Sequence, residues 1–385
     1  MRICLVYDVL YPHTVGGAER WYRNVALRLA AEGHDVTYLT MRQWDAAEPP
    51  DLPGVQLIAV SGRMPLYSGE RRRILPPLAF GLGVLWHLIR HGRRYDVVHT
   101  ASFPYFSLLA AALVRPFGGY RVVVDWHELW TSGYWREYLG RLGGWLGWRV
   151  QRLCLRVPHR AFCFSRLVEQ RLVAEGVRGV TLLEGQFEGE PAAAPLPAEP
   201  VVVFAGRHVR EKNPVAVVHA VAKARETIPD LRGAIYGDGP ERPQVLAAIA
   251  EHGLESVIEA PGFVDEEAIE DALARALCLV LPSRREGYGL VVVETLSKGT
   301  PVVLVRGEDN ASTELVEEDV NGFVAPSASA DDLAAAIARV SEAGPELRAS
   351  ALASFKRNAG RLSLQGSLAE VSAAYGAQAE ATKAS

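Results

Sequence analysis

Apolar and polar positions follow one another along the chain in a pattern typical of an α/β protein. Short apolar runs of strand length are separated by longer stretches in which apolar residues recur at helical spacing. In the first half the expected strands are residues 2–7, 36–40, 56–60, 96–100, 121–125, 161–165 and 180–183, with helices at 18–31, 78–90 and 106–114 between them. This alternation predicts a doubly wound parallel sheet.

A second series of strands and helices follows a proline-rich stretch, residues 185–200, which has the composition of a linker. The expected strands are 201–205, 233–236, 257–260, 278–281 and 302–305, and the expected helices are 215–226, 242–251, 266–276, 290–298, 331–340 and 346–357. We therefore expect an N-terminal domain (1–190), a linker (191–200), a C-terminal domain (201–358) and a segment (359–385) that packs back on the first domain and frays from residue 376. Two Rossmann-like domains joined in this way predict a ligand cleft between them.

Charge is distributed unevenly, although the net charge of the 385-residue chain is only −4. Residues 1–190 carry a balance of +6 and contain arginine but no lysine. The run Arg71-Arg72-Arg73 and the aromatic residues crowded into positions 126–148 favour an anionic partner or a membrane surface. Solvated arginines and an aromatic core explain the same features, so both interpretations stay open.

Other features narrow the class of protein. The four cysteines lack metal-like spacing and predict buried, reduced thiols. Met1 leads straight into a strand, so we expect no signal peptide, and prolines interrupt the longest apolar stretch, residues 74–89, so we expect no membrane-spanning helix. No P-loop, zinc motif or nucleophile elbow is present, and nothing predicts a nucleic-acid partner.

The most informative stretch is residues 279–294. An apolar run ends at Pro282, and a loop then carries Glu286, Gly287, Tyr288 and Gly289 to a helix that begins at Leu290. A helix N-terminus suits a phosphate, and Glu294, one turn further in, is placed to meet the hydroxyls of a polyol. Acidic residues near a helix start also stabilise the helix without any ligand.

Three further loops follow strands of the second series, at the edge where doubly wound sheets bind ligands. Arg207 and Lys212 follow the first strand and form a natural pair for a diphosphate, although such loops are often basic only because they are exposed. Gly237 follows the next strand, where a small residue allows a tight turn or close approach of a ligand. Phe263 follows a third strand and either stacks on a nucleobase or packs in the core.

Two candidate positions lie in the first series. Gly16 and Gly17 precede a helix, so their N–H groups are suited to a phosphate or sugar, but paired glycines are also common in ordinary loops. His127 follows the strand that ends at Asp125, on the ligand side of the sheet. A lone histidine is more often structural than catalytic.

Together these motifs resemble the retaining family-four glycosyltransferases, which have the two-domain GT-B fold. The resemblance covers nearly the whole chain. The Glu-x7-Glu motif from Glu286 to Glu294 is its most specific part, and four shorter motifs occur in the family's order at residues 16–20, 206–213, 237–240 and 321–324. It implies an α/β enzyme with two doubly wound Rossmann-like domains that face each other across a cleft.

The resemblance also implies roles for matching residues. Arg207 and Lys212 hold the donor diphosphate, and Glu294 bonds the ribose. Glu286 bonds hydroxyls of the donor sugar, while backbone N–H groups from Tyr288 to Leu290 meet the sugar and phosphate.

Gly17 approaches the donor from the N-terminal domain, which binds the acceptor, and His127 lines the reaction centre. The expected catalytic group is His127, Glu286, Arg207 and Lys212. One departure is residues 184–188, which read Glu-Gly-Gln-Phe-Glu in place of the family's Pro-Asn-Gly-Val-Asp, so no role is carried onto them. The other is Glu128, which follows His127 where aspartate is frequent.

The expected function is transfer of a hexose, with retained configuration and no metal or cofactor, from a UDP- or GDP-sugar to an acceptor hydroxyl. A role in cell-envelope or polysaccharide synthesis places the enzyme in the cytoplasm or on the inner face of the cell membrane. The acceptor is a glycan, a lipid-linked sugar or a small molecule. Competing interpretations are a nucleotide-sugar epimerase of the same fold and a non-catalytic protein that binds nucleotide sugars.

Overall fold

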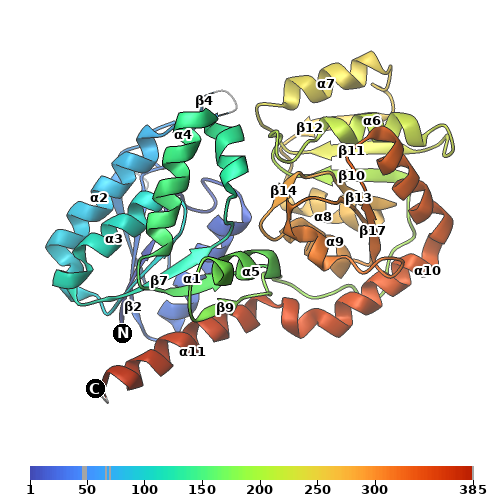
Figure 1. Ribbon diagram of the computed structural model, residues 1–385. Coiled ribbons are helices and arrows are strands. Elements are labelled where there is room, and N and C mark those ends of the chain that lie inside the picture. Colours follow the sequence, from blue (N-terminus) through green and yellow to red (C-terminus); the bar gives the residue numbers. More distant parts are fainter. Residues whose placement is uncertain (46–49, 66, 69–70, 384–385) are drawn as a thin grey trace. The chain divides into compact units, whose positions relative to one another are not determined.

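The computed structural model describes residues 1–45, 50–65, 67–68 and 71–383. The chain forms two compact units, one from Met1–Glu184 with Ser367–Ser385 and the other from Gly185–Gly366 (Figure 1). Both are α/β units of the Rossmann-like type, which confirms the expected fold class.

Unit 1 is built on a seven-stranded sheet whose strands all run parallel. In spatial order these strands are β3 (Val55–Ser61), β2 (Asp35–Met41), β1 (Arg2–Val6), β6 (Val97–Ala101), β7 (Arg121–Trp126), β8 (Arg160–Cys163) and β9 (Val180–Leu182). Its helices are α1 (Gly17–Ala31), α2 (Leu75–His91), η1 (Gly92–Arg94), α3 (Tyr105–Gly118), α4 (Ser132–Leu155) and α5 (Arg166–Ala174), and a short antiparallel pair joins β4 (Tyr67–Ser68) to β5 (Arg71–Arg72).

Unit 2 repeats this plan with six parallel strands. In spatial order these are β12 (Ile258–Gly262), β11 (Arg232–Tyr236), β10 (Val201–Ala205), β13 (Cys278–Leu281), β15 (Val302–Val305) and β17 (Gly322–Ala325). The helices are α6 (Val215–Ala224), α7 (Arg242–Glu251), α8 (Glu266–Arg275), α9 (Leu290–Ser297), η2 (Ala311–Leu315) and α10 (Ala330–Leu362), which is interrupted at Gly344.

The order of strands reverses once in each sheet, between β1 and β6 and between β10 and β13. Such a switch point leaves a crevice at the carboxyl ends of the two adjacent strands, because their connections leave in opposite directions. The core of each unit lies between its sheet and helices and is dominated by valine and leucine, with alanine added in unit 2 and aromatic rings in unit 1. All four cysteines are buried free thiols, as expected.

The proline-rich stretch at residues 185–200 is held against unit 2 by its backbone. Ala192 N donates to Ser297 O and Glu199 N donates to Arg275 O, while the buried Arg348 donates from Nε to Leu196 O. The composition of this stretch predicts a free linker, because proline and glutamate do not pack into a core. The structure differs because backbone N–H and carbonyl groups, which composition does not reveal, hydrogen-bond the stretch to the rest of unit 2. The unit boundaries fall at Glu184 and Gly366, compared with residues 190 and 358 in the sequence-based division.

The C-terminal helix α11 (Leu364–Lys383) continues through the residues expected to fray from position 376. Its part from Ser367 onward belongs to unit 1. Among the residues that the structure describes, no helix is long and apolar enough to cross a lipid bilayer.

Candidate active site

The loops that follow β10 and β13 leave the switch point of unit 2 side by side. These two strands are direct neighbours, with Val203 opposite Leu279. The backbone joins their loops, because Arg284 N donates to Glu211 O at 2.8 Å. The expected diphosphate loop and the Glu-x7-Glu motif are therefore adjacent, although 74 residues separate Lys212 from Glu286.

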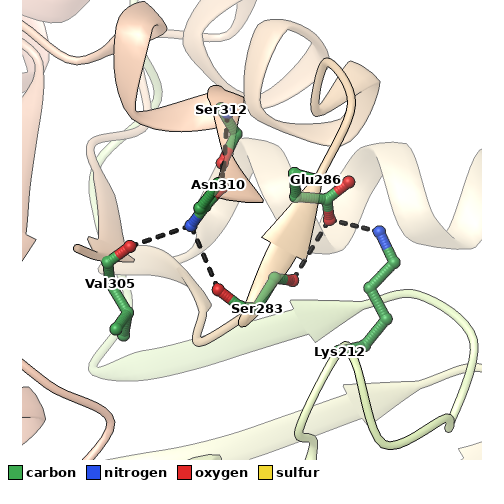
Figure 2. Close-up of polar contacts among 6 residues, drawn as sticks. All are labelled: Lys212, Ser283, Glu286, Val305, Asn310 and Ser312. Atoms are coloured by element: carbon green, nitrogen blue, oxygen red, sulfur yellow. Dashed lines mark hydrogen bonds and ion pairs between the residues drawn. The ribbon is translucent and has the colours of Figure 1, made fainter. Parts of the chain in front are cut away.

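Lys212 and Glu286 form an ion pair between Nζ and Oε1. Ser283 Oγ also donates to Glu286 Oε1, at 3.1 Å (Figure 2). Glu286 is 8% exposed, so its carboxylate depends on these two donors in place of water. The ammonium group of Lys212 therefore lies at the carboxyl ends of two adjacent strands, β10 and β13. The Glu286 carboxylate that holds it can also accept hydrogen bonds from the hydroxyls of a polyol.

Asn310 holds together three segments of the chain next to this ion pair. Its amide Nδ2 donates to Ser283 O at 3.1 Å and to Val305 O at 2.8 Å, and its Oδ1 accepts from Ser312 N and Oγ (Figure 2). It therefore joins the ends of β13 and β15 to the start of η2, and it is almost fully buried.

Asp309 and Asn310 form strand β16 (Asp309–Asn310), which pairs in parallel with β14 (Arg285–Glu286) and places Asn310 opposite Glu286. The available signal for Asn310 was its capping pattern, because Asn310 precedes Ser312 at the start of a short helix.

Helix α9 begins next to Glu286 without a side-chain cap. Gly289 occupies its N-cap with φ +95°, a conformation that favours glycine, and a Cβ there would lie 2.6 Å from Ser312 Cβ. Leu290 opens the helix and Glu294 lies one turn further along. The backbone here offers the positive end of a helix dipole, as expected for a phosphate site.

The loops after β10, β11 and β12 are also joined by their backbones. Gly206 N donates to Tyr236 O, and Gly237 N donates to Gly262 O at 2.8 Å. A Cβ at Gly237, where φ is +115°, would lie 2.0 Å from Gly206 O, so this close approach requires glycine. Phe263 follows at the end of β12 and is 73% exposed, which excludes the alternative that it packs in the core.

Arg207 has an exposed side chain at the start of the same loop as Lys212. The next residue, His208, is fully buried, and neither ring nitrogen meets hydrogen-bond geometry with any described residue. Burial lowers the pKa of His208, and Asp238 and the Tyr236 backbone offset this only in part. No pattern in the sequence indicates that this histidine is buried.

Acid is expected to destabilise the fold through His208. Because folding lowers the pKa of His208, the unfolded chain binds a proton at a higher pH than the folded chain does. The stability that this group contributes above about pH 6.5 is therefore lost as the pH falls. We expect His208→Leu to show a smaller decrease in Tm between about pH 7.5 and about pH 5.5 than the wild type. His13→Leu, at an exposed position, is the control. Equal decreases in all three proteins would contradict the expectation.

In unit 1, His127 lies just beyond β7. Its ring stacks on Phe164 with centroids 4.6 Å apart, and its buried Nε2 has no partner among the described residues. Burial lowers the pKa of His127, although Asp125 and Glu128 act in the opposite direction. The imidazole is therefore neutral near pH 7. Gly16 caps α1 in an extended conformation without a side-chain hydrogen bond, and Gly17 is the first residue of that helix.

A buried polar network that the sequence did not predict lies beneath His127. Asp125 Oδ1 is 2.8 Å from His99 Nε2, and Asp125 Oδ2 accepts from Trp21 Nε1 at 2.7 Å. His99 Nδ1 is 2.6 Å from the hydroxyl of Tyr375 in α11. All four side chains are almost completely buried. The C-terminal helix is thus bonded to the strand that carries His127.

The aromatic cluster of residues 126–148 is partly core. Trp126 and Trp135 are buried, and Gln151 Oε1 accepts from Trp135 Nε1 at 3.1 Å and from Tyr105 OH at 2.9 Å. Trp145 is exposed. The side chains of Arg71 and Arg72 lie outside the described residues, and Arg73 is exposed.

Two Rossmann-like units, one with a basic loop beside an uncapped helix at its switch point, suit a protein that binds a nucleotide diphosphate or its conjugate. Residues 189–359 match the family model for glycosyl transferases group 1, and residues 15–182 match the model for glycosyltransferase family 4. The two matches together identify the chain as a member of glycosyltransferase family 4. Its activity is the transfer of a sugar from a nucleotide sugar.

Curated relatives agree with the family match. The chain is 29% identical to a D-inositol 3-phosphate glycosyltransferase of Saccharomonospora viridis over 87% of this chain and 83% of that protein. It is 25% identical to the glycogen synthase of Mycobacterium tuberculosis over 90% of each chain. It is also 32% identical to the alpha-D-kanosaminyltransferase of Streptomyces kanamyceticus, but over only 39% of this chain and 38% of that protein.

Solved structures share the fold. Sucrose-phosphate synthase from Thermosynechococcus elongatus has a TM-score of 0.79 and 21% identity over 99% of both chains. Anabaena Alr3699/HepE in complex with UDP and glucose has a TM-score of 0.74 and 17% identity over 98% of this chain and 99% of that one. At these identities the similarity concerns the fold alone.

Proposed function

We propose that this enzyme is a retaining, metal-independent hexosyltransferase that uses a UDP- or GDP-sugar. The observation that carries the proposal is the Lys212–Glu286 pair at the switch point, next to the uncapped start of α9. When the bond between the sugar C1 and the diphosphate breaks, the diphosphate keeps the electron pair. The acceptor hydroxyl oxygen bonds to C1 on the same face and passes its proton to the departing diphosphate oxygen. Cations and helix N–H groups that meet the departing charge lower the barrier.

Each residue has a stated role in this proposal. Arg207 and Lys212 bind the diphosphate, with the N–H groups of Gly287 to Leu290. Glu294 binds the ribose, and Glu286 binds hydroxyls of the donor sugar after releasing Lys212. His127 lines the reaction centre as a neutral imidazole, and Gly16 and Gly17 meet the donor from unit 1.

Product analysis tests this proposal. Incubation with nucleotide sugars, chelator and an acceptor panel should give nucleoside diphosphate and a glycoside of unchanged anomeric configuration by NMR. Loss of transfer in EDTA with recovery on adding Mg²⁺ or Mn²⁺ would overturn metal independence. An inverted product would overturn retention, and an epimerised nucleotide sugar without glycoside would favour the epimerase alternative.

Phe263 is proposed to stack on the nucleobase, because its ring is exposed beside Gly237 and Gly262. Base–aromatic stacking contributes about 1–3 kcal/mol, so Phe263→Ala should raise the Kd of the nucleoside diphosphate by about 5- to 150-fold. Isothermal titration calorimetry with UDP and with GDP measures this and identifies the base, for which UDP is favoured by the ligands in the HepE complexes. Phe117→Ala, at an equally exposed ring in unit 1, is the control. An unchanged Kd for Phe263→Ala would remove the role.

The acceptor is proposed to be a glycan or lipid-linked sugar of envelope or polysaccharide synthesis, used on the cytoplasmic side of the cell membrane. The +6 balance of the first half supports this choice. The rival is a small water-soluble acceptor, as the name of the D-inositol 3-phosphate glycosyltransferase indicates for that relative. The acceptor panel above should therefore contain both kinds.

A further inference from the structure

Apolar side chains left exposed are concentrated on neighbouring helices of unit 1. Most of the large exposed ones in the described residues belong to α2, α3 and α4. Single exposed apolar residues need no explanation, but a contiguous group marks an interaction surface. Helices α2 and α3 lie side by side in Figure 1.

Helix α2 is apolar on two opposite faces. Phe80, Val84 and Leu88 are fully buried against the sheet and α3. On the other face Leu75, Leu82, Trp86 and Ile89 are each more than half exposed, with Leu82 at 65%. Their spacing of three, four and seven residues places them on one stripe. A helix at the surface of a globular protein normally presents polar side chains there.

The stripe continues onto α3. Arg93 Nε, just after α2, donates to Phe117 O at 3.2 Å. A Cβ at Gly92 would lie 3.8 Å from Gly118 Cα, so the C-terminal ends of both helices meet. Phe117 is 74% exposed there, and Leu113 is exposed one turn earlier. We name Leu75, Leu82, Trp86, Ile89, Leu113 and Phe117 the α2–α3 face.

The charged side chains that α2, η1 and α3 contribute at this face are all positive. The guanidinium of Arg90 lies 3.7 Å from the centre of the Trp86 ring. Arg73, Arg93 and Arg94 are exposed at the two ends of α2, and neither α2, η1 nor α3 contains an aspartate or glutamate. An apolar face whose own helices carry arginine and no acidic residue is complementary to an anionic, apolar surface.

We propose that the α2–α3 face docks this enzyme on a lipid bilayer that contains anionic headgroups. The apolar side chains enter the interface, Trp86 lies at headgroup depth, and the arginines extend to the lipid phosphates. A second copy of the chain is a poorer occupant, because pairing this face with itself brings the arginines together. The proposal concerns where the enzyme works and does not depend on its donor or stereochemistry.

Co-sedimentation of the full chain with vesicles tests the proposal. The wild type should pellet with phosphatidylcholine vesicles that contain phosphatidylglycerol, bind pure phosphatidylcholine more weakly, and dissociate as salt is raised. Leu82→Gln/Trp86→Gln/Ile89→Gln should lower the partition coefficient by at least about tenfold. The matched control is Val173→Gln/Leu246→Gln, which removes exposed apolar side chains elsewhere and should bind as the wild type does.

A charge variant separates the two contributions. Arg90→Gln/Arg93→Gln/Arg94→Gln should lower binding to anionic vesicles by about fivefold per arginine at low salt. Circular dichroism and UDP affinity should be unchanged in all variants, so loss of vesicle binding is distinguishable from misfolding or from failure of the proposed donor site. Three outcomes would overturn the proposal: no wild-type binding to anionic vesicles, equal loss in the control, or self-association in light scattering that the face variant abolishes without any vesicle binding.

Discussion

Lys212→Ala is expected to lower kcat/KM for sugar transfer by about two to three orders of magnitude, comparable to the loss of one preorganised donor to a developing oxyanion. In the free enzyme Lys212 is held by Glu286, with Nζ on Oε1. This contact orients the ammonium group at the carboxyl ends of β10 and β13 before the donor arrives. Negative charge on the diphosphate grows as the sugar leaves. Removal of the Lys212 ammonium group should therefore reduce kcat more than it raises KM.

The variant needs controls for stability, because it leaves the buried Glu286 carboxylate with one fewer donor. Lys223→Ala removes a lysine of unit 2 that pairs with Glu226 at the surface, and it should retain full activity. The double variant Lys212→Ala/Glu286→Gln relieves the unpaired charge and separates stability from catalysis. If Lys212→Ala is folded and its kcat/KM is within about twofold of the wild type, the loop is an ordinary basic surface and the proposed role is wrong.

The central strands could be predicted closely from the sequence. β10, β13 and β15 have the predicted bounds, since each is an uninterrupted apolar run ended by proline, glycine or a charged residue. Their order in the sheet places the loops with Lys212 and Glu286 together, so much of the candidate site followed from the strand pattern. Phe263 remained ambiguous because a phenylalanine at a strand end packs inward or outward, and only its exposure decides between them.

Contacts between side chains and distant backbone could not be predicted in this way. Asn310 is a hub because carbonyl groups of Ser283 and Val305 converge on its amide, and these carbonyls carry no signature in the sequence. The stretch at 185–200 has the composition of a linker but is held by backbone hydrogen bonds. The stretch at 74–89 was interpreted only as too interrupted to span a membrane, because periodicity does not show that a helix has a second apolar face in solvent.

Asp125→Ala is expected to lower the free energy of unfolding by about 2–6 kcal/mol, because two buried donors lose their acceptor at about 1–3 kcal/mol each. His99 Nε2 and Trp21 Nε1 would both lose their acceptor in a region without water access. The loss should appear in urea unfolding monitored by probes in unit 1, because the two units have separate cores. Tyr375→Phe should cost less, about 1–3 kcal/mol, because it leaves only His99 Nδ1 without its partner.

The pH dependence distinguishes the charge of Asp125 from its packing. Burial alone would raise the pKa of Asp125, but His99, His127 and the Trp21 N–H together hold it below the usual carboxyl value. A depressed carboxyl pKa supplies stability above the ordinary pKa of an aspartate, and this stability is lost as the pH falls below it. Asp125→Asn retains the shape and one acceptor, so its stability should decrease less steeply toward low pH than that of the wild type. Parallel pH profiles would mean that the pair contributes through packing alone. If Asp125→Asn is as stable as the wild type near neutral pH but has a lower kcat, the Asp125 carboxylate contributes to transfer by positioning His127, which follows the same strand.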